Sequence, residues 1–207
     1  MRLDKAIARN GLTRQMAKKA IAGGRARVNG NVVLDPGYLL KPEDEVLLDG
    51  ENARAPENVH LMLHKPAGFL TATEDARGER TVLDLLPEKI RMRKVGPVGR
   101  LDKDVTGLLI LTTDGQLAHR LISPKWDVEK TYYAEIEGEI DDECVRRFAE
   151  GVPLKEFTCK PARLERAGAG ACRVYVSEGK YHQVKRMLAA VGHPVLRLKR
   201  EKIGPVA

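Results

Sequence analysis

The chain has 207 residues, of which 43% are hydrophobic and 4% aromatic, and its formal net charge is +7. This length suits one large domain or a medium domain with a small one, so a packed and mostly aliphatic core is expected. Three cysteines without CxxC spacing argue against a disulfide framework or a zinc site, and no apolar run approaches the roughly 18 residues of a membrane span. We therefore expect a globular, cytoplasmic monomer that binds no membrane.

The positive charge is concentrated at the N-terminus. Residues 1–30 hold eight basic side chains and one acidic side chain, Asp4, so they carry the whole net charge, and the rest of the chain is neutral. A solvated helix face usually mixes charges of both signs. A segment of one sign favours binding of a polyanion such as a nucleic acid.

Residues 1–48 predict a small basic domain of two helices and a hairpin. Thr13 is a good N-cap for the second helix, and Gly23 and Gly24 end it. Asn29 and Gly30 suit the type I′ turn of a hairpin. The expected elements are helices over residues 2–9 and 13–22 and strands over residues 25–28, 31–34 and 45–48. The polar residues 49–58 that follow indicate a linker.

Residues 59–207 predict a second domain in which strands and helices alternate. The expected strands are 61–63, 108–112, 131–137, 162–165 and 173–176, and the expected helices are 82–86, 116–122, 142–150 and 181–191. The turn signal at residues 167–171 implies an antiparallel hairpin, so a mixed or antiparallel sheet with flanking helices is favoured over a doubly wound parallel sheet. The expected fold class of the chain is α+β.

The sequence GRLDKDVTG, residues 99–107, leads directly into the apolar run at residues 108–111. It places Asp102 in a loop before a buried strand, where a rigid scaffold can hold a catalytic carboxylate. The same residue types also form turns in which an Asp side chain accepts from backbone N–H groups. By itself this segment favours the turn.

Three further segments bear on Asp102. HKPAGFLTAT, residues 64–73, indicates by itself only the end of a strand. EKTYYAEIEGE, residues 129–139, alternates as a strand does, so Tyr132 and its neighbour face opposite sides, one for core packing and one able to stack on a base. EGKYHQVKRM, residues 178–187, begins a basic helix that suits an anion, and a basic surface turn explains it equally well.

In this order, the motifs KPAG, GRLDKDVTGLLILTTDG, KTYYAEIEG and EGKYHQVKRMLAAVGHPV resemble those of the bacterial rRNA pseudouridine synthases of the RsuA family. The N-terminal MRLDKAIA and GRARVNGNVV segments are similar to a small RNA-binding domain first recognised in a ribosomal small-subunit protein. The resemblance covers nearly the whole chain. It implies isomerisation of one uridine in small-subunit 16S rRNA, as rRNA or in an assembly intermediate, with no cofactor and no metal.

The resemblance also implies roles for individual residues. Asp102 takes the place of the family's catalytic aspartate. Lys185 would pair with Asp102 and favour its charged form, and Tyr132 would stack on the uracil and assist removal of the ring proton. Related families carry Arg at the position of Lys185, so Lys185 keeps the charge without the bidentate geometry. The expected substrate-binding residues are Arg100, Lys180, His182 and Gln183. The expected RNA-binding residues are Arg2, Arg14, Lys18, Lys19, Arg25 and Arg27.

Several alternatives stay open. A carboxylate can attack the sugar, attack the ring or remove a sugar proton. The target base is expected to leave its stack for a pocket, with Arg100 filling the vacated space or holding phosphate. Asp104 and Asp114 could join Asp102 in binding Mg²⁺ or cleaving glycosidic bonds, but a hydrolase would release the base. The other candidate functions are a large-subunit rRNA synthase of the same family and a non-catalytic rRNA-binding assembly factor.

Overall fold

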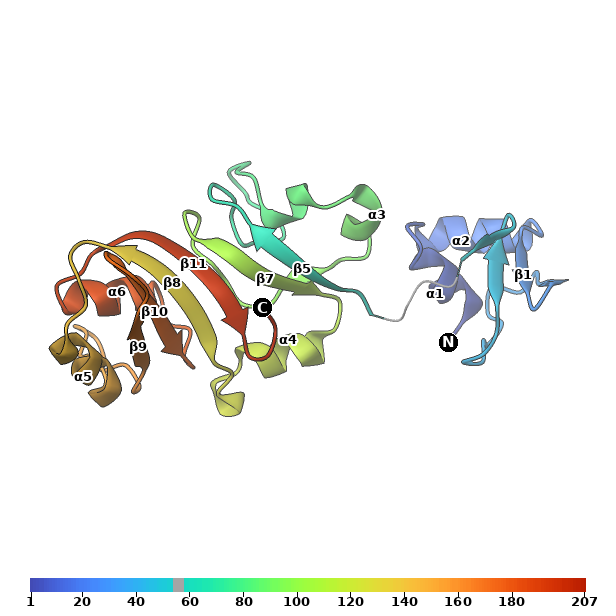
Figure 1. Cartoon of the computed structure of the whole chain (residues 1–207). Helices are drawn as coiled ribbons and strands as arrows, with labels where there is room; N and C mark the ends of the chain where they lie inside the picture. Colours follow the sequence, from blue (N-terminus) through green and yellow to red (C-terminus); the bar gives the residue numbers. More distant parts are fainter. Residues whose placement is uncertain (54–57) are drawn as a thin grey trace. The chain divides into compact units, whose positions relative to one another are not determined.

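The computed structural model describes residues 1–53 and 58–207 (Figure 1). It contains two compact units, Met1–Val59 with Leu85–Val95, and His60–Asp84 with Gly96–Ala207. Part of the expected linker, residues 54–57, lies outside the described residues. None of the described helices is long and apolar enough to span a bilayer.

The first unit contains three helices and a four-stranded antiparallel sheet in the order β2-β1-β3-β4. Its elements are α1 (Leu3–Ala8), α2 (Arg14–Ala22), β1 (Ala26–Val28), β2 (Asn31–Val32), β3 (Val46–Leu48), β4 (Glu51–Asn52) and the short helix α3 (Glu88–Arg91). Leu3, Ile7 and Ile21 are completely buried in its core with Val46. The predicted helix cap is confirmed, because the Thr13 hydroxyl accepts a hydrogen bond of 3.1 Å from the N–H of Met16.

Each of the two hairpins of this unit turns at two consecutive residues with positive φ. Asn29 and Gly30 have φ of 49° and 81°, which confirms the predicted turn. Asp49 and Gly50 have φ of 55° and 85° and join β3 to β4. The first residues of the expected linker are therefore a strand, because Asp-Gly is itself a hairpin signal.

The second unit is built on a seven-stranded sheet in the order β5-β7-β11-β8-β10-β9, with β6 also pairing with β7 (Figure 1). The strands are β5 (His60–Lys65), β6 (Gly96–Pro97), β7 (Thr106–Thr112), β8 (Lys130–Ile136), β9 (Arg163–Arg166), β10 (Ala171–Val176) and β11 (Val195–Ile203). The β7–β11 pair is parallel and the other pairs are antiparallel. The sheet is therefore mixed, and the predicted α+β fold is confirmed.

Helices cover the sheet at several places. They are η1 (Val82–Leu85), α4 (Gly115–Ile122), η2 (Pro124–Trp126), α5 (Asp142–Glu150) and α6 (Gln183–Ala190). Helix α4 packs Ala118 and Leu121 against a cluster that includes Leu108 and Ile110 of β7. Six of the seven residues of β7 are buried, as expected for a strand with partners on both edges.

Strand β11 was absent from the predicted elements although it lies at the centre of the sheet. It pairs with β7 on one side and β8 on the other. Its sequence, VLRLKREKI, is rich in charge, and its pairing with β8 shifts register between Val195 and Arg197 and again between Arg200 and Lys202. Because each shift breaks the period of two, the strand has no clean alternating pattern.

Gly107 is the point where β7 and β11 approach most closely. It has a φ of 104°, and a Cβ atom there would lie 2.2 Å from the carbonyl oxygen of Arg200. Only glycine avoids both the backbone strain and this contact. The last residue of the GRLDKDVTG segment is therefore required by the sheet.

Gly107→Ala is expected to lower the free energy of unfolding by about 3 kcal/mol or more, because neither backbone can move without breaking strand pairing. Urea unfolding followed by circular dichroism measures this change. Gly115→Ala is the matched control, since its Cβ would meet no atom within 4 Å at the start of α4. Equal stability of Gly107→Ala and the unmodified protein would contradict the close approach.

Candidate active site and RNA-binding surface

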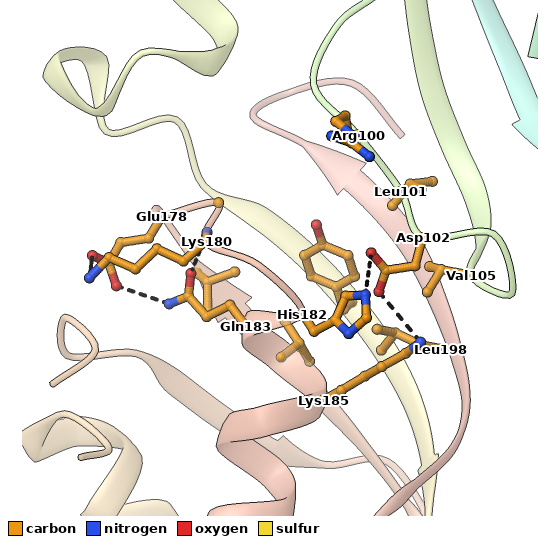
Figure 2. A pocket seen from close by; sticks show the side chains of 14 residues that line it. Arg100, Leu101, Asp102, Val105, Glu178, Lys180, His182, Gln183, Lys185 and Leu198 are labelled. Carbon is orange, nitrogen blue, oxygen red and sulfur yellow. Dashed lines mark hydrogen bonds and ion pairs between the residues drawn. The ribbon is translucent and has the colours of Figure 1, made fainter. Parts of the chain in front are cut away.

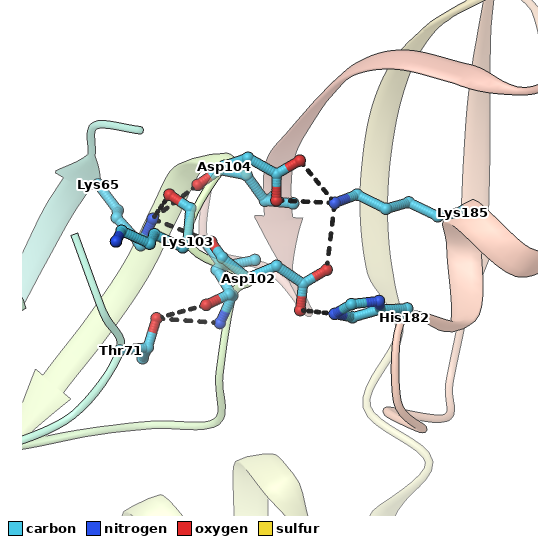
Figure 3. A network of polar contacts seen from close by, with 9 residues as sticks. Lys65, Thr71, Asp102, Lys103, Asp104, His182 and Lys185 are labelled. Atoms are coloured by element: carbon cyan, nitrogen blue, oxygen red, sulfur yellow. Dashed lines mark hydrogen bonds and ion pairs between the residues drawn. The ribbon is translucent and has the colours of Figure 1, made fainter. Parts of the chain in front are cut away.

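The loop that carries Asp102 is fixed from the interior by Lys65. Lys65 ends β5, and its side chain is completely buried. Its Nζ donates hydrogen bonds to the carbonyl oxygens of Val105 at 2.8 Å, Asp102 at 3.0 Å, Lys103 at 3.1 Å and Pro66 at 3.1 Å (Figure 3). An ammonium group has three hydrogens, so at least one is shared between two carbonyls. Burial lowers the pKa of Lys65, and the charges of Asp104 and Asp102 act in the opposite direction.

The segment that follows Lys65 holds the same loop from a second direction. The Thr71 hydroxyl donates to the carbonyl of Leu101 at 2.7 Å and accepts from its N–H at 3.2 Å (Figure 3). The N–H of Gly68 donates to the carbonyl of Lys103 at 2.7 Å. Residues 64–73 thus do more than end a strand. The signal available in the sequence was a lysine that alternates into the buried face of a strand and has no local partner.

The Asp102 carboxylate projects from this loop toward the start of α6. Its Oδ2 lies 3.4 Å from Nζ of Lys185, and its Oδ1 lies 3.4 Å from Nε2 of His182 (Figure 2). Its side chain is 29% exposed. The structure therefore brings Asp102, Lys185 and His182 together.

Lys185 also binds a second carboxylate. Its Nζ donates to both oxygens of Asp104 at 2.8 Å, which is shorter than its contact with Asp102 (Figure 3). The Lys185 hydrogen bond is the main cause that holds the pKa of Asp104 below its usual value. Asp104 and Asp102 thus face a shared ammonium group, and the role of Asp104 as a partner of Lys185 was missed from the sequence.

Tyr132 faces the same pocket from β8. The lining side chains of this pocket include Arg100, Asp102, Tyr132, Lys180, His182 and Lys185 (Figure 2). Tyr133 lies in a different surface hollow, with its ring 5.7 Å from the guanidinium carbon of Arg173. Of the two tyrosines, Tyr132 is therefore the one that lines the pocket of Asp102.

A glutamate that was not singled out from the sequence organises the loop before α6. Glu178 accepts from Nε2 of Gln183 at 2.9 Å and lies 3.2 Å from Nζ of Lys180. Burial raises its pKa, but the N–H of Lys160 and the side chains of Lys180 and Gln183 outweigh this effect and lower it. Gln183 is buried and also accepts from the N–H of Lys180 at 3.1 Å. Lys180 and Gln183, two of the four expected substrate-binding residues, thus line the pocket while paired with Glu178.

His182 has an unusual backbone conformation at the pocket. Its φ is 46°, in the left-handed region, and its ring stacks on Tyr181 with centroids 3.8 Å apart. Non-glycine residues in this region cost energy and cluster at functional sites. Here the conformation directs the imidazole of His182 toward Asp102.

The six basic side chains expected to bind RNA are all exposed, but three are paired with carboxylates. Arg2 and Arg14 bind the buried carboxylate of Asp4 at 3.2 and 3.1 Å, and Arg25 pairs with Asp49. Burial opposes ionisation of Asp4, but the two arginines hold its pKa below its usual value.

The other three basic side chains have no carboxylate partner among residues 1–53 and 58–207. Arg27 donates to the carbonyl of Gly30 at 2.9 Å. Lys18 and Lys19 on α2 form no ion pair with a residue in the described part of the chain. They are the charges most available to a phosphate.

Comparisons with known proteins identify the family of each domain. Residues 59–190 match the RNA pseudouridylate synthase family, and residues 1–46 match the S4 domain. The chain is 43% identical to the ribosomal small subunit pseudouridine synthase A of Escherichia coli K12, covering 100% of this chain and 90% of that protein. An uncharacterized RNA pseudouridine synthase of Aquifex aeolicus is 40% identical, covering 99% of this chain and 86% of that one. A crystal structure of a pseudouridylate synthase matches with a TM-score of 0.69 and 39% identity, covering 100% of this chain and 90% of that one.

The chain therefore belongs to the RNA pseudouridine synthase family, whose members are isomerases, and it carries an S4 domain for RNA binding. Within that family it is of the RsuA type, similar over its whole length to ribosomal small subunit pseudouridine synthases. The resemblance stated from the sequence motifs is confirmed.

Lys65→Met is expected to lower the free energy of unfolding by about 3 kcal/mol, because it leaves buried carbonyls without a donor. It is also expected to lower kcat about 100-fold, because the loop that carries Asp102 loses its internal support. Chemical denaturation and turnover on RNA measure the two effects. Lys155→Met, at an exposed position, is the control. Full activity of Lys65→Met would show that the loop holds its shape without the ammonium group.

Proposed function

We propose that this enzyme converts the uridine at position 516 of small-subunit 16S rRNA to pseudouridine, and that the Asp102 carboxylate initiates the reaction. The observation that carries the choice of substrate is the similarity to ribosomal small subunit synthases along the entire chain. The choice of Asp102 is supported by its place in the pocket, on a loop that is fixed from behind and opposite two nitrogen-bearing side chains.

The reaction breaks the bond between the ribose C1′ and N1 of uracil, turns the base, and joins C1′ to C5. The base gives up its C5 proton and takes up a proton at N1, so the product is an isomer of the substrate. An ionised carboxylate can begin this sequence by attacking C1′, attacking the ring or removing a sugar proton. All three routes require a charged Asp102, and Nζ of Lys185 lies 3.4 Å from its Oδ2.

Tyr132 and Arg100 act on the base and on its RNA neighbours in this proposal. The target uridine leaves the RNA stack and enters the pocket, where the ring of Tyr132 stacks on the uracil and its hydroxyl assists removal of the C5 proton. The exposed Arg100 fills the vacated space or holds a phosphate. Lys180, His182 and Gln183 contact the substrate from the other side of the pocket.

Asp102→Asn is expected to lower tritium release from 16S transcripts labelled at uracil C5 by about 1000-fold or more, because it removes the ionised group. Asp142→Asn, an exposed change on α5, is the control and retains activity. Asp102→Asn activity equal to that of the unmodified enzyme would overturn the assignment.

The substrate choice is tested by chemical mapping of pseudouridine in treated rRNA. The expected result is modification of 16S rRNA at the proposed uridine. Modification found only in 23S rRNA would identify a large-subunit enzyme instead. If neither rRNA loses tritium from uracil C5, the result would favour a non-catalytic assembly factor.

Replacing Lys18 and Lys19 together by Glu is expected to raise the Kd for the rRNA transcript about tenfold or more with little change in kcat, because both charges contact phosphate. Binding measured over a range of salt concentrations is expected to show a shallower salt dependence than the unmodified enzyme. The control replaces Lys155 by Glu. An unchanged Kd and salt slope would exclude this face of α2 from RNA binding.

A further inference from the structure

Arg200 on β11 is a buried cation without a counter-charge among the residues that the structure describes. Its relative exposure is 4%. Nε donates to the carbonyl of Leu108 at 2.8 Å, and Nη1 donates to the Tyr132 hydroxyl at 3.5 Å. The buried Nη2 has no hydrogen-bond partner among the described residues, and the structure shows no ion pair between Arg200 and a carboxylate of residues 1–53 or 58–207. Buried polar atoms are nearly always satisfied, and buried charges are nearly always paired.

The surroundings of Arg200 add positive charge. Lys130, which begins β8, has its pKa lowered first by burial and then by the charge of Arg200. Asp127 acts in the opposite direction on Lys130 but is itself paired with Lys160. The region behind Tyr132 is therefore electropositive.

The backbone of Arg200 connects β8, which carries Tyr132, with β7, which follows the loop of Asp102. Arg200 pairs with Tyr132 of β8 on one side and with Gly107 of β7 on the other. Since Gly107 ends the GRLDKDVTG segment, Arg200 lies between the loop of Asp102 and the tyrosine that faces it. The main-chain contact at Gly107 fixes the position from which the guanidinium reaches the Tyr132 hydroxyl.

We propose that Arg200 is a positioning residue that acts through Tyr132: its guanidinium holds the phenol oxygen at the pocket and stabilises negative charge on it. This inference rests on the proposed function. Tyr132 first releases its hydroxyl proton to solvent. When C1′ is bonded to C5, the ring carries a C6–N1 double bond. The phenolate takes the C5 proton, the C–H electron pair forms the C5–C6 double bond, the C6–N1 π electrons move to N1, and N1 takes a proton from solvent. Tyr132 is then neutral again, and no proton is gained or lost overall.

The charge of the proposed phenolate explains why an arginine suits position 200. A phenolate next to this buried guanidinium forms a charge pair whose cation is shielded from water, and such a pair is stronger than one between two fully exposed groups. Nη2, which has no partner among the described residues, supplies the donor for this anion after a small movement. In the neutral state Tyr132 uses only the long contact of 3.5 Å.

The test uses the full-length enzyme, 16S transcript labelled at uracil C5 and single-turnover conditions. Arg200→Met is expected to lower the rate about 100-fold with an unchanged Kd for RNA, and Arg200→Lys to recover about tenfold. In a Tyr132→Phe background, Arg200→Met is expected to add less than about threefold, because the group through which it acts is gone. Arg197→Met on the same strand, at an exposed side chain, is the matched control.

Deuterium at uracil C5 gives a readout that packing alone does not change. Arg200→Met is expected to show a larger isotope effect on the rate than the unmodified enzyme, because proton removal has become slower. The proposal would be overturned if the rate losses of Arg200→Met and Tyr132→Phe multiplied in the double variant. It would also be overturned if the isotope effect of Arg200→Met equalled that of the unmodified enzyme. If Arg200→Met does not fold, Arg200→Lys with and without Tyr132→Phe gives the same comparison. Activity retained by Asp102→Asn contradicts the proposed function, whereas activity retained by Arg200→Met contradicts only this inference.

Discussion

A single buried ammonium group supports the site of this enzyme. Lys65 draws four carbonyl oxygens toward one point beneath the loop of residues 99–105. Because the backbone turns its oxygens inward, the side chain of Asp102 is left pointing out toward α6. The loop is thus shaped by contacts on its interior side, and its exterior side stays free for RNA. Thr71 and Gly68, in the segment that follows Lys65, add hydrogen bonds to this loop. The Asp102 carboxylate is therefore positioned before any substrate arrives.

Much of the fold could be predicted from local signals. Thr13 caps α2, Asn29-Gly30 makes a hairpin, and the apolar run after Thr106 is a strand buried by partners on both edges. Strand β11 could not be predicted in this way. Successive side chains of β11 lie in different surroundings. Its two register shifts also interrupt the two-residue alternation from which strands are predicted. Its place in the sheet is determined by β7 and β8, which lie far away in the sequence.

In the candidate site, too, some features could be predicted from local sequence and others depend on residues far away in the sequence. From its own segment Asp102 was indistinguishable from a turn residue, and only the ordered motifs related it to Lys185 and Tyr132. The only signal for Lys65 was its place on the buried face of a strand, and Arg200 gave none, because their main partners are backbone carbonyls and a hydroxyl that the fold brings to them. Glu178 was missed for a similar reason, since its role depends on the path of the chain around Gln183. Side chains that bind distant backbone leave no spacing pattern in a sequence.

Lys185 lies between two carboxylates, 2.8 Å from Asp104 and 3.4 Å from Asp102. A guanidinium fork would bind one carboxylate in a fixed plane, whereas an ammonium group is a point charge that rotates freely. A displacement of less than an ångström is therefore enough to exchange its stronger and weaker contacts. Asp104 is mostly exposed and Asp102 is not, so added salt or an approaching phosphate screens the first contact more than the second. The strength of the electrostatic support for Asp102 thus depends on the ionic surroundings of the pocket as well as on the fold.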